Sequence, residues 1–265
     1  MIYQDALIQV KSGNAMLFYG AGMSYDVINI INEKMPTSDK LSDKLDKDAE
    51  GDLTLASELY IDKNGTKSLI ELLKSNFKTK DMETNPPEYY KIIAAENWRS
   101  IFTTNYDDAF ETASRKIGKY RESVEPEMTP KDYPINDNSI IHVNGFINTI
   151  TSEKLNTTFK LTEGSYLADQ FIKGNWYNAF MSEVQASKAI IFIGYGLRAD
   201  FDIKKIFFEF NEHLKGKTFF ITLKENKILE RYGSVIPIGI QGFAEDLKNL
   251  NLDNLPEKSI EILNF

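Results

Sequence analysis

The sequence contains no cysteine, which excludes disulfide bonds and thiolate zinc sites. It has no run approaching the roughly 18 apolar residues that a membrane-spanning helix needs, and no charged-then-apolar N-terminus typical of a signal peptide. We therefore expect a cytoplasmic protein with no membrane contact. Lysine and arginine are outnumbered by aspartate and glutamate, 31 to 39, and the net charge of −8 argues against direct nucleic-acid binding, which depends on neutralising phosphates.

Short apolar runs alternate along the chain with segments of helical periodicity. The runs at 15–19, 101–103 and 189–193 are continuous, as in strands that are buried on both faces. This alternation predicts an α/β fold with three layers and a mostly parallel sheet. With 265 residues, 42% of them hydrophobic, the chain can bury one sizeable core, and we expect a single domain over 1–265.

The block 36–96 separates the first two predicted strands and is predicted to be a helical insertion. Its first part, 36–52, is rich in aspartate and lysine, and we interpret it as a solvated loop or helix face. Two or three helices are predicted over 53–96. Helical spacing also predicts helices at 27–31 and 200–213.

A glycine-rich turn follows the first predicted strand, with the sequence Gly20-Ala21-Gly22-Met23-Ser24. Glycines at 20 and 22 let the backbone approach a ligand, while the amides that follow and the Ser24 hydroxyl can face a phosphate. The full dinucleotide fingerprint would have a third glycine where Tyr25 stands. An ordinary strand-to-helix turn is the alternative.

A second glycine turn, Gly194-Tyr195-Gly196-Leu197, closes another apolar run. Taken alone it is only a turn. Since the carboxyl ends of parallel strands share one edge of a sheet, the two glycine turns together point to a dinucleotide that lies across this edge.

A polar cluster, Thr103-Thr104-Asn105-Tyr106-Asp107, ends the second predicted strand at the same edge. Asn105 carries a donor and an acceptor, so it can hold a sugar hydroxyl or a water molecule without a charge. Asp107 can bind a carboxamide or a ribose hydroxyl. The alternative is that either residue only caps the helix that follows.

The chain has two histidines. His213, near the end of a predicted helix, is interpreted as a surface residue. His142 lies in an apolar run two positions before Asn144, so strand alternation sends both side chains to one face. A histidine near the ligand edge can act as a general base at neutral pH, and a hydrogen-bonded core histidine is the alternative.

Taken in order, these four motifs resemble those of the sirtuin-like domains of bacterial antiphage NAD hydrolases: Gly20–Ser24, Thr103–Asp107, His142–Gly145 and Gly194–Leu197. The segment 159–166 also looks like the one that precedes a helix in those domains. The resemblance implies a Rossmann-like sheet with a helical module that binds NAD across the strand edge.

The resemblance also implies that the nicotinamide bond of NAD is cleaved to give ADP-ribose and nicotinamide, with no metal. Asn105 and His142 would be catalytic by motif position. The NAD-binding residues would be Gly20, Ala21, Gly22 and Ser24 at the diphosphate, Gly194 and Gly196 at the adenosine, and Thr103 and Asp107, the latter at the nicotinamide end.

Two departures from the family pattern affect this interpretation. Many relatives have histidine directly before the glycine, whereas here Asn144 holds that place and His142 lies two residues earlier. The protein deacetylases of the family carry a four-cysteine zinc module, which this chain cannot build. Hydrolysis is therefore favoured over protein deacylation or ADP-ribosyl transfer.

The resemblance implies a toxic effector of antiphage defence that acts by abortive infection and is held inactive until triggered. We therefore expect a homo-oligomer or an activating partner protein. The rival hypothesis, from a different functional class, is a non-catalytic module that senses NAD or ADP-ribose.

Overall fold

The computed structural model describes residues 1–168, 174–196 and 214–252. Within these residues one seven-stranded sheet has the order β3-β4-β2-β1-β5-β6-β7, and every neighbouring pair of strands is parallel. The strands are β1 (Ala15–Tyr19), β2 (Ser100–Thr103), β3 (Glu122–Val124), β4 (Ser139–His142), β5 (Ala189–Ile193), β6 (Thr218–Ile221) and β7 (Ser234–Ile236). The predicted parallel α/β sheet is confirmed.

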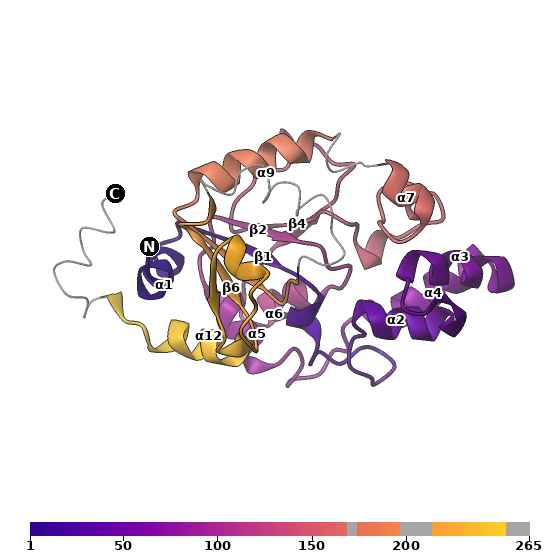
Figure 1. Cartoon of the computed structure of the whole chain (residues 1–265), viewed down its shortest axis with the longest axis horizontal. Coiled ribbons are helices and arrows are strands. Elements are labelled where there is room, and N and C mark those ends of the chain that lie inside the picture. Colours follow the sequence, from indigo (N-terminus) through magenta and orange to yellow (C-terminus); the bar gives the residue numbers. More distant parts are fainter. Residues whose placement is uncertain (169–173, 197–213, 253–265) are drawn as a thin grey trace.

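Helices cover both faces of this sheet (Figure 1). One face carries α1 (Tyr3–Lys11), α5 (Glu88–Ala95), α6 (Ala109–Lys116) and α12 (Gly239–Asn249). The other face carries α9 (Asn175–Ala186). The side chains of β1 alternate between the two layers: Leu17 and Tyr19 pack under α5 and α6, whereas Met16 and Phe18 pack under α9. Strands β1 and β5 are buried on both faces, so their sequences are continuous apolar runs, whereas the edge strands β3 and β7 are partly exposed.

A helical cap lies at one end of the molecule (Figure 1) and has an apolar core of its own. It contains α2 (Ser38–Leu45), α3 (Leu53–Asn64) and α4 (Thr66–Phe77), and α7 (Glu163–Ala168) contacts α3. Side chains from after β4, including Phe146, Phe159 and Leu161, complete that core. The cap is therefore assembled from two separate stretches of sequence.

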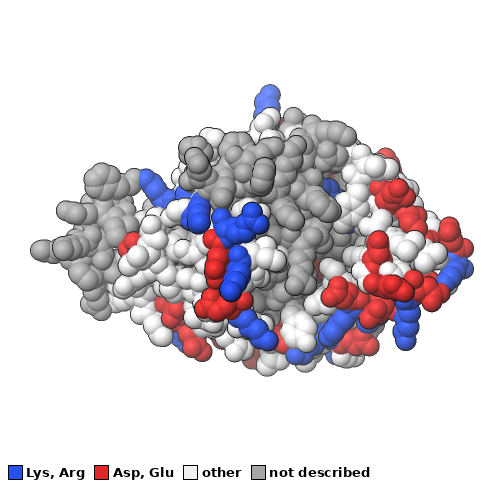
Figure 2. Space-filling model, viewed as in Figure 1, with Lys and Arg blue, Asp and Glu red and all other residues white. Residues whose placement is uncertain are grey.

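The predicted block 36–96 divides between the cap and the main body. Helices α2 to α4 belong to the cap, whereas α5 packs on the sheet through Tyr90, Ile93 and Ala94. The charged part, 36–52, includes α2, whose Leu41 and Leu45 are buried. Acidic and basic side chains gather together over the cap, as Figure 2 shows.

The prediction of a helix at 27–31 is wrong. A 3-10 turn at Ala21–Ser24 is followed by a tight loop. The buried Asn29 side chain closes that loop by accepting hydrogen bonds from the backbone N–H groups of Ile31 and Glu33, at 3.2 and 2.9 Å. Asparagine often competes with helix formation in this way.

The predicted helix 200–213, which includes His213, lies outside the described residues. Within the part of the chain that the structure describes, no helix is long and apolar enough to cross a membrane.

Candidate active site

The two glycine turns meet at the point where the strand order of the sheet reverses. Strands β2, β4 and β3 lie on one side of β1, with β3 at the edge, and the chain then returns to place β5 against the other side of β1. In open α/β sheets a ligand crevice forms at such a switch point, outside the carboxyl ends of the strands. The turn after β1 begins at Gly20 and the turn after β5 begins at Gly194.

Direct contact between the turns explains the need for glycine. The Gly22 amide donates to the Gly194 carbonyl at 2.9 Å. A Cβ at Gly194 would lie 2.1 Å from the Met23 nitrogen, and Gly194 also has a φ of +63°, which favours glycine. By contrast, a Cβ at Gly196 would meet nothing within 4 Å. Gly22 and Gly194 therefore serve the packing of the two turns as well as any approach to a ligand.

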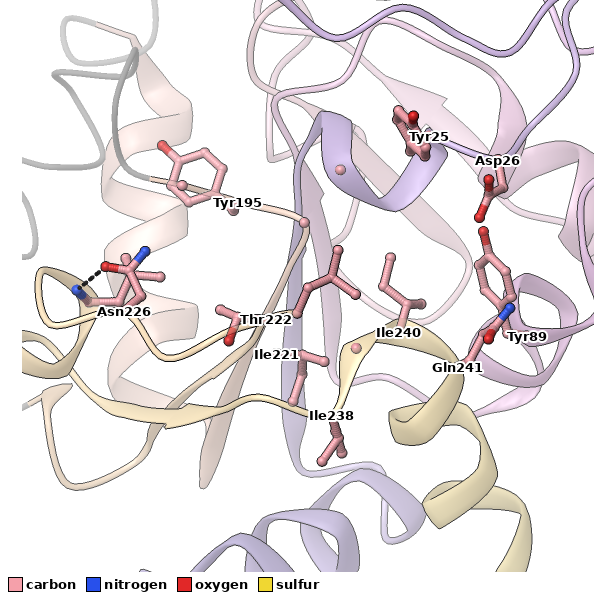
Figure 3. Close-up of a pocket in the computed structure, with 16 residues that line it drawn as sticks. Tyr25, Asp26, Tyr89, Tyr195, Ile221, Thr222, Asn226, Ile238, Ile240 and Gln241 are labelled. Carbon is pink, nitrogen blue, oxygen red and sulfur yellow. Dashed lines mark hydrogen bonds between the residues drawn. The ribbon is translucent and has the colours of Figure 1, made fainter.

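Two cavities adjoin the second turn, and both are bordered by Gly194, Tyr195 and Gly196. The first, of about 580 Å³, lies beyond the ends of β6 and β7 (Figure 3). Its described lining is mainly apolar and neutral polar, and includes Tyr25, Ile221, Thr222, Leu223, Asn226, Ile238 and Gln241. The second cavity, of about 650 Å³, lies between the sheet edge and the cap, and includes Ser24, Asn105, Asp107 and Asn144.

Most of the predicted site residues lie at these cavities. Seven of the ten line one or both: Ala21, Gly22, Ser24, Asn105, Asp107, Gly194 and Gly196. The described lining does not include Gly20, Thr103 or His142.

Hydrogen bonds fix the orientation of the Asn105 amide. Its Nδ2 donates to the Ser24 hydroxyl and to the Asp107 carboxylate, both at 3.0 Å. Ser24 is in turn 3.1 Å from the hydroxyl of Tyr90. A carboxylate can only accept, so the amide nitrogen must face Asp107. The Asn105 side-chain oxygen is therefore the atom left for a ligand.

Asp107 is a buried carboxylate at the wall of the second cavity. Only 3% of the residue is exposed, and its Oδ1 accepts from the Ala109 backbone at 3.1 Å. Burial raises the pKa of the Asp107 carboxyl to about 6, with further contributions from the nearby charges of Asp108 and Glu111. This group therefore changes its charge close to neutral pH.

Thr103 supports the site from behind. Its hydroxyl donates to the Tyr19 carbonyl and accepts from the backbone N–H of Asn105, both at 2.9 Å, and the residue is fully buried. It thus ties the start of the polar cluster to β1.

His142 is also fully buried, and both of its ring nitrogens have partners. Nδ1 lies 2.9 Å from the backbone oxygen of Asn105, and Nε2 lies 2.7 Å from Glu111 Oε1. Burial alone would lower the pKa of His142, but the Glu111 carboxylate outweighs burial and raises it. Burial likewise acts to raise the pKa of Glu111, but His142 and the hydrogen bonds to the carboxylate lower it overall.

The expectation that His142 and Asn144 share one face is wrong. Strand β4 ends at His142, so its alternation does not continue to Asn144. His142 is fully buried and is absent from the described lining of the second cavity, whereas Asn144 lines that cavity.

Sequence reasoning missed Glu111 and Tyr90. The four-residue spacing of Glu111 from Asp107 places it one helical turn further along the same segment, which was an available signal. Tyr90 offered none, because it comes from α5, before the strand that carries the motif.

Part of the chain matches a known protein family. The family model described as a SIR2-like domain matches residues 99–235, just over half of the chain. This chain therefore belongs to the SIR2-like domain family. It is 30% identical over 122 residues to the NAD(+) hydrolase ThsA of Cytobacillus dafuensis, an alignment that covers 45% of this chain and 24% of that protein.

One structural comparison is more distant. The alignment with a solved structure from work on the mechanism and regulation of Sir2 enzymes spans 93% of this chain and 97% of the chain in that structure. The TM-score is 0.48 and the identity is 14%.

Proposed function

We propose that this chain is an NAD glycohydrolase that cleaves NAD to ADP-ribose and nicotinamide. The observation that carries the proposal is the pair of adjoining cavities at the strand switch point, with Asn105 and Asp107 in one of them. A dinucleotide has two nucleoside halves joined by a diphosphate, so it matches two cavities joined by a glycine turn. Membership of the SIR2-like family and the similarity to a protein named as an NAD(+) hydrolase support the same substrate.

In this proposal the adenosine half occupies the 580 Å³ cavity, beside Gly194 and Gly196. The diphosphate lies along the turn Gly20–Ser24, since Gly22 borders the first cavity and Ala21 and Ser24 border the second. The nicotinamide riboside half occupies the cavity under the cap, and Asp107 faces the nicotinamide end.

The second cavity suits the chemistry of this bond. Nicotinamide leaves from a cationic ring, so departure needs no strong acid, and the ribose develops positive charge as it leaves. Carboxylates among the lining residues, from Asp39, Asp52, Asp107 and Glu163, favour both positive charges. The Asn105 side-chain oxygen, left free by its fixed amide nitrogen, accepts from a ribose hydroxyl or orients the attacking water.

The test is to incubate purified protein with NAD and to follow nicotinamide by chromatography. Asn105→Ala should lower the rate about 100-fold or more, the size seen when a polar group that stabilises a transition state is removed. Asn64→Ala, at an exposed position on the cap, is the matched control and should keep the parental rate. If Asn105→Ala cleaves NAD at the parental rate, the catalytic role proposed for Asn105 is wrong.

The rival is a module that binds NAD or ADP-ribose without cleaving it. It is favoured by one observation: among the described residues no imidazole lines either cavity. Calorimetry decides between the two, because tight binding of NAD with no nicotinamide release, at any protein concentration, would support the rival.

We further propose that NAD loss is the toxic output of an antiphage effector that self-assembly or a partner protein activates. This proposal rests on the motif resemblance. Expression in bacteria should lower cellular NAD and arrest growth for the parent and not for Asn105→Ala. Phage challenge of the two strains then tests the defence role.

A further inference from the structure

We propose that Asp107 is the general base of NAD cleavage, and that His142 and Glu111 form a positioning pair that holds Asn105. This inference rests on the proposed NAD-cleaving function. It gives the catalytic proton transfer to a residue for which the sequence motifs suggested only a binding role, and it moves His142 away from the substrate.

The protonation of His142 follows from its partners. The Asn105 backbone oxygen can only accept, so Nδ1 must carry a hydrogen. On the other side, Glu111 Oε1 accepts from the Ser123 hydroxyl at 2.7 Å and lies 2.7 Å from Nε2, as expected for a carboxylate beside a protonated ring. With a hydrogen on both nitrogens, the ring has no lone pair with which to take a proton from water.

The same pair positions Asn105. His142 holds the Asn105 backbone carbonyl, while Ser24 and Asp107, which line the cavity, hold its side-chain amide. Because Glu111 anchors the far side of the ring, removing either member of the pair loosens the hold on the Asn105 carbonyl and leaves the Asn105 backbone held at its N–H by Thr103. The catalytic residue would then lose its alignment without any loss of a group that touches substrate.

Asp107 has both the place and the proton affinity of a base. It lines the second cavity, and its carboxylate accepts from the Ala109 backbone, the Asn105 side chain and the Ser24 hydroxyl, which leaves one of its four lone-pair positions for a water molecule. Burial raises its pKa to about 6. A base with a pKa slightly below the working pH is ionised and still accepts a proton readily.

Asp107 takes one proton from a water molecule, and the water oxygen bonds to C1′ of the nicotinamide ribose. The bond from C1′ to the nicotinamide nitrogen breaks, and its electron pair returns to that nitrogen and neutralises the ring. ADP-ribose and nicotinamide leave, and Asp107 releases its proton to solvent.

Several titratable groups surround Asp107, and each bears on its pH dependence. Tyr19 of β1, Tyr90 of α5, Glu111 of α6 and His142 of β4 interact with it electrostatically, as does its neighbour Asp108. Asp39, Asp52 and Glu163 line the same cavity. Both tyrosine pKa values are raised by burial, so these two groups stay neutral near pH 7.

The experiment compares pH profiles of nicotinamide release for the parent, Asp107→Asn, His142→Gln and Asp108→Asn, with NAD affinity measured by calorimetry. The parental kcat/KM should rise with pH to half its maximum near pH 6. Asp107→Asn should lose this rise and about 100-fold or more in kcat, the size typical of a general base, while NAD affinity changes little. Formate should restore part of the activity of Asp107→Ala.

The two other variants separate positioning from catalysis. His142→Gln should lower the plateau and keep the rise near pH 6, because the base is still present. Asp108→Asn should keep the plateau and move the rise to lower pH, since the charge of Asp108 helps to raise the pKa of Asp107. Asp108 does not line the cavity, and its carboxylate bonds instead to the Thr79 amide at 2.8 Å and to Asn148 at 3.2 Å.

Two outcomes would overturn the inference. One is an Asp107→Asn enzyme that keeps the rate and the rise while His142→Gln loses both. The other is an Asp107→Asn enzyme that binds NAD weakly with kcat unchanged, as expected if Asp107 only binds NAD and takes no part in proton transfer. A parent that releases no nicotinamide would defeat the proposed function instead. Nitrogen NMR of His142 is independent of turnover: a neutral ring at pH 7 would refute the positioning pair.

Discussion

The ionised carboxylate of Asp107 is disfavoured in the folded protein because it is buried. Its pKa in the fold, about 6, lies above the ordinary value of 3.8 because burial disfavours the carboxylate. A group whose pKa is raised by folding makes its full contribution to the free energy of unfolding at pH values below its unfolded pKa. That contribution is lost as the pH rises through the folded pKa. The charged form is therefore a liability to the fold at neutral pH, as is common where a carboxylate is kept for chemistry.

We predict that Asp107→Asn raises the free energy of unfolding at pH 7. The pKa difference corresponds to at most about 3 kcal/mol, and loss of an acceptor for Asn105 brings the expected gain to about 1–2 kcal/mol. Urea unfolding at pH 7 and at pH 4 is the measurement, and the gain should shrink at the lower pH. Asp39→Asn, an exposed carboxylate of the same cavity, should change stability by less than about 0.5 kcal/mol. A destabilised Asp107→Asn at pH 7 would contradict the prediction.

The buried pair of His142 and Glu111 has the opposite pH behaviour. The pKa of His142 is raised in the fold, so its contribution is fully present below the ordinary pKa of 6.5 and is lost as the pH rises through the folded value. Glu111→Gln should destabilise the protein at pH 7 by about 3 kcal/mol or more, because the ring loses its buried partner. Thermal unfolding measures this, and a loss under about 1 kcal/mol would show that the pair is not ionised.

At the scale of elements, the contact between the two strand-end turns is the most demanding packing at the site. Gly194→Ala should lower the free energy of unfolding by more than about 2 kcal/mol, because it combines a positive φ with a Cβ that would lie 2.1 Å from a backbone atom. Gly196→Ala is the matched control, since its Cβ would meet nothing within 4 Å. Thermal unfolding of the two variants tests this, and equal midpoints would contradict the role given to the turn contact.

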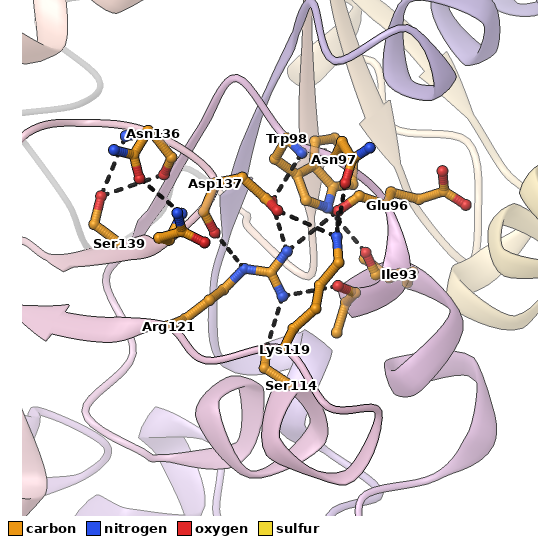
Figure 4. Close-up of polar contacts among 12 residues, drawn as sticks. Ile93, Glu96, Asn97, Trp98, Ser114, Lys119, Arg121, Asn136, Asp137 and Ser139 are labelled. Atoms are coloured by element: carbon orange, nitrogen blue, oxygen red, sulfur yellow. Dashed lines mark hydrogen bonds and ion pairs between the residues drawn. The ribbon is translucent and has the colours of Figure 1, made fainter.

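Arg121, which precedes β3, ties several elements together from one buried guanidinium (Figure 4). It donates to the Ala94 carbonyl at 2.7 Å, the Glu96 carbonyl at 3.2 Å and the Ser114 hydroxyl at 2.8 Å, and it pairs with Asp137 before β4. The guanidinium thereby satisfies carbonyls at the end of α5 and fastens α5 and α6 to the edge of the sheet.

We predict that Arg121→Lys destabilises the fold by about 3 kcal/mol, because a single ammonium cannot reach all of these acceptors and leaves buried carbonyls without donors. Arg115→Lys, on the exposed side of α6, should change stability by less than about 0.5 kcal/mol. Urea unfolding of both variants is the measurement. Similar values for the two would show that the network adds little.

At the scale of the whole molecule, the proposed binding mode uses the two cavities as one long site across the sheet edge. NAD and ADP-ribose should therefore stabilise the Asn105→Ala variant, whose cleavage of NAD should be slow, by about 2.7 kcal/mol at a hundredfold excess over Kd. For a chain of this size the expected rise in Tm is about 5 °C or more. Nicotinamide alone, which fills part of one cavity, should give a much smaller rise.

The ligand series also tests the two-cavity arrangement. Adenosine monophosphate should bind the first cavity more weakly than NAD binds the whole site. A mononucleotide that matches the stabilisation by NAD would show that one cavity suffices and that the other serves a different purpose.

The sequence alone determined the parts that depend on neighbouring residues. Strands buried on both faces appear as apolar runs, so β1, β2 and β5 and the parallel sheet could be predicted. Asn105 and Asp107 could also be placed at the ligand edge, because the end of β2 fixes where they emerge. The loop at 27–31 could not be predicted, since the Asn29 side chain overrides the helical spacing.

The tertiary structure decided what each polar group can do. Whether His142 can accept a proton depends on Glu111, a residue 31 positions away that helix α6 brings under the ring. Whether Gly194 must be glycine depends on the backbone of the first turn. Local pattern fixes backbone direction and burial, but protonation and steric fit depend on distant partners, which only the packed sheet brings into contact.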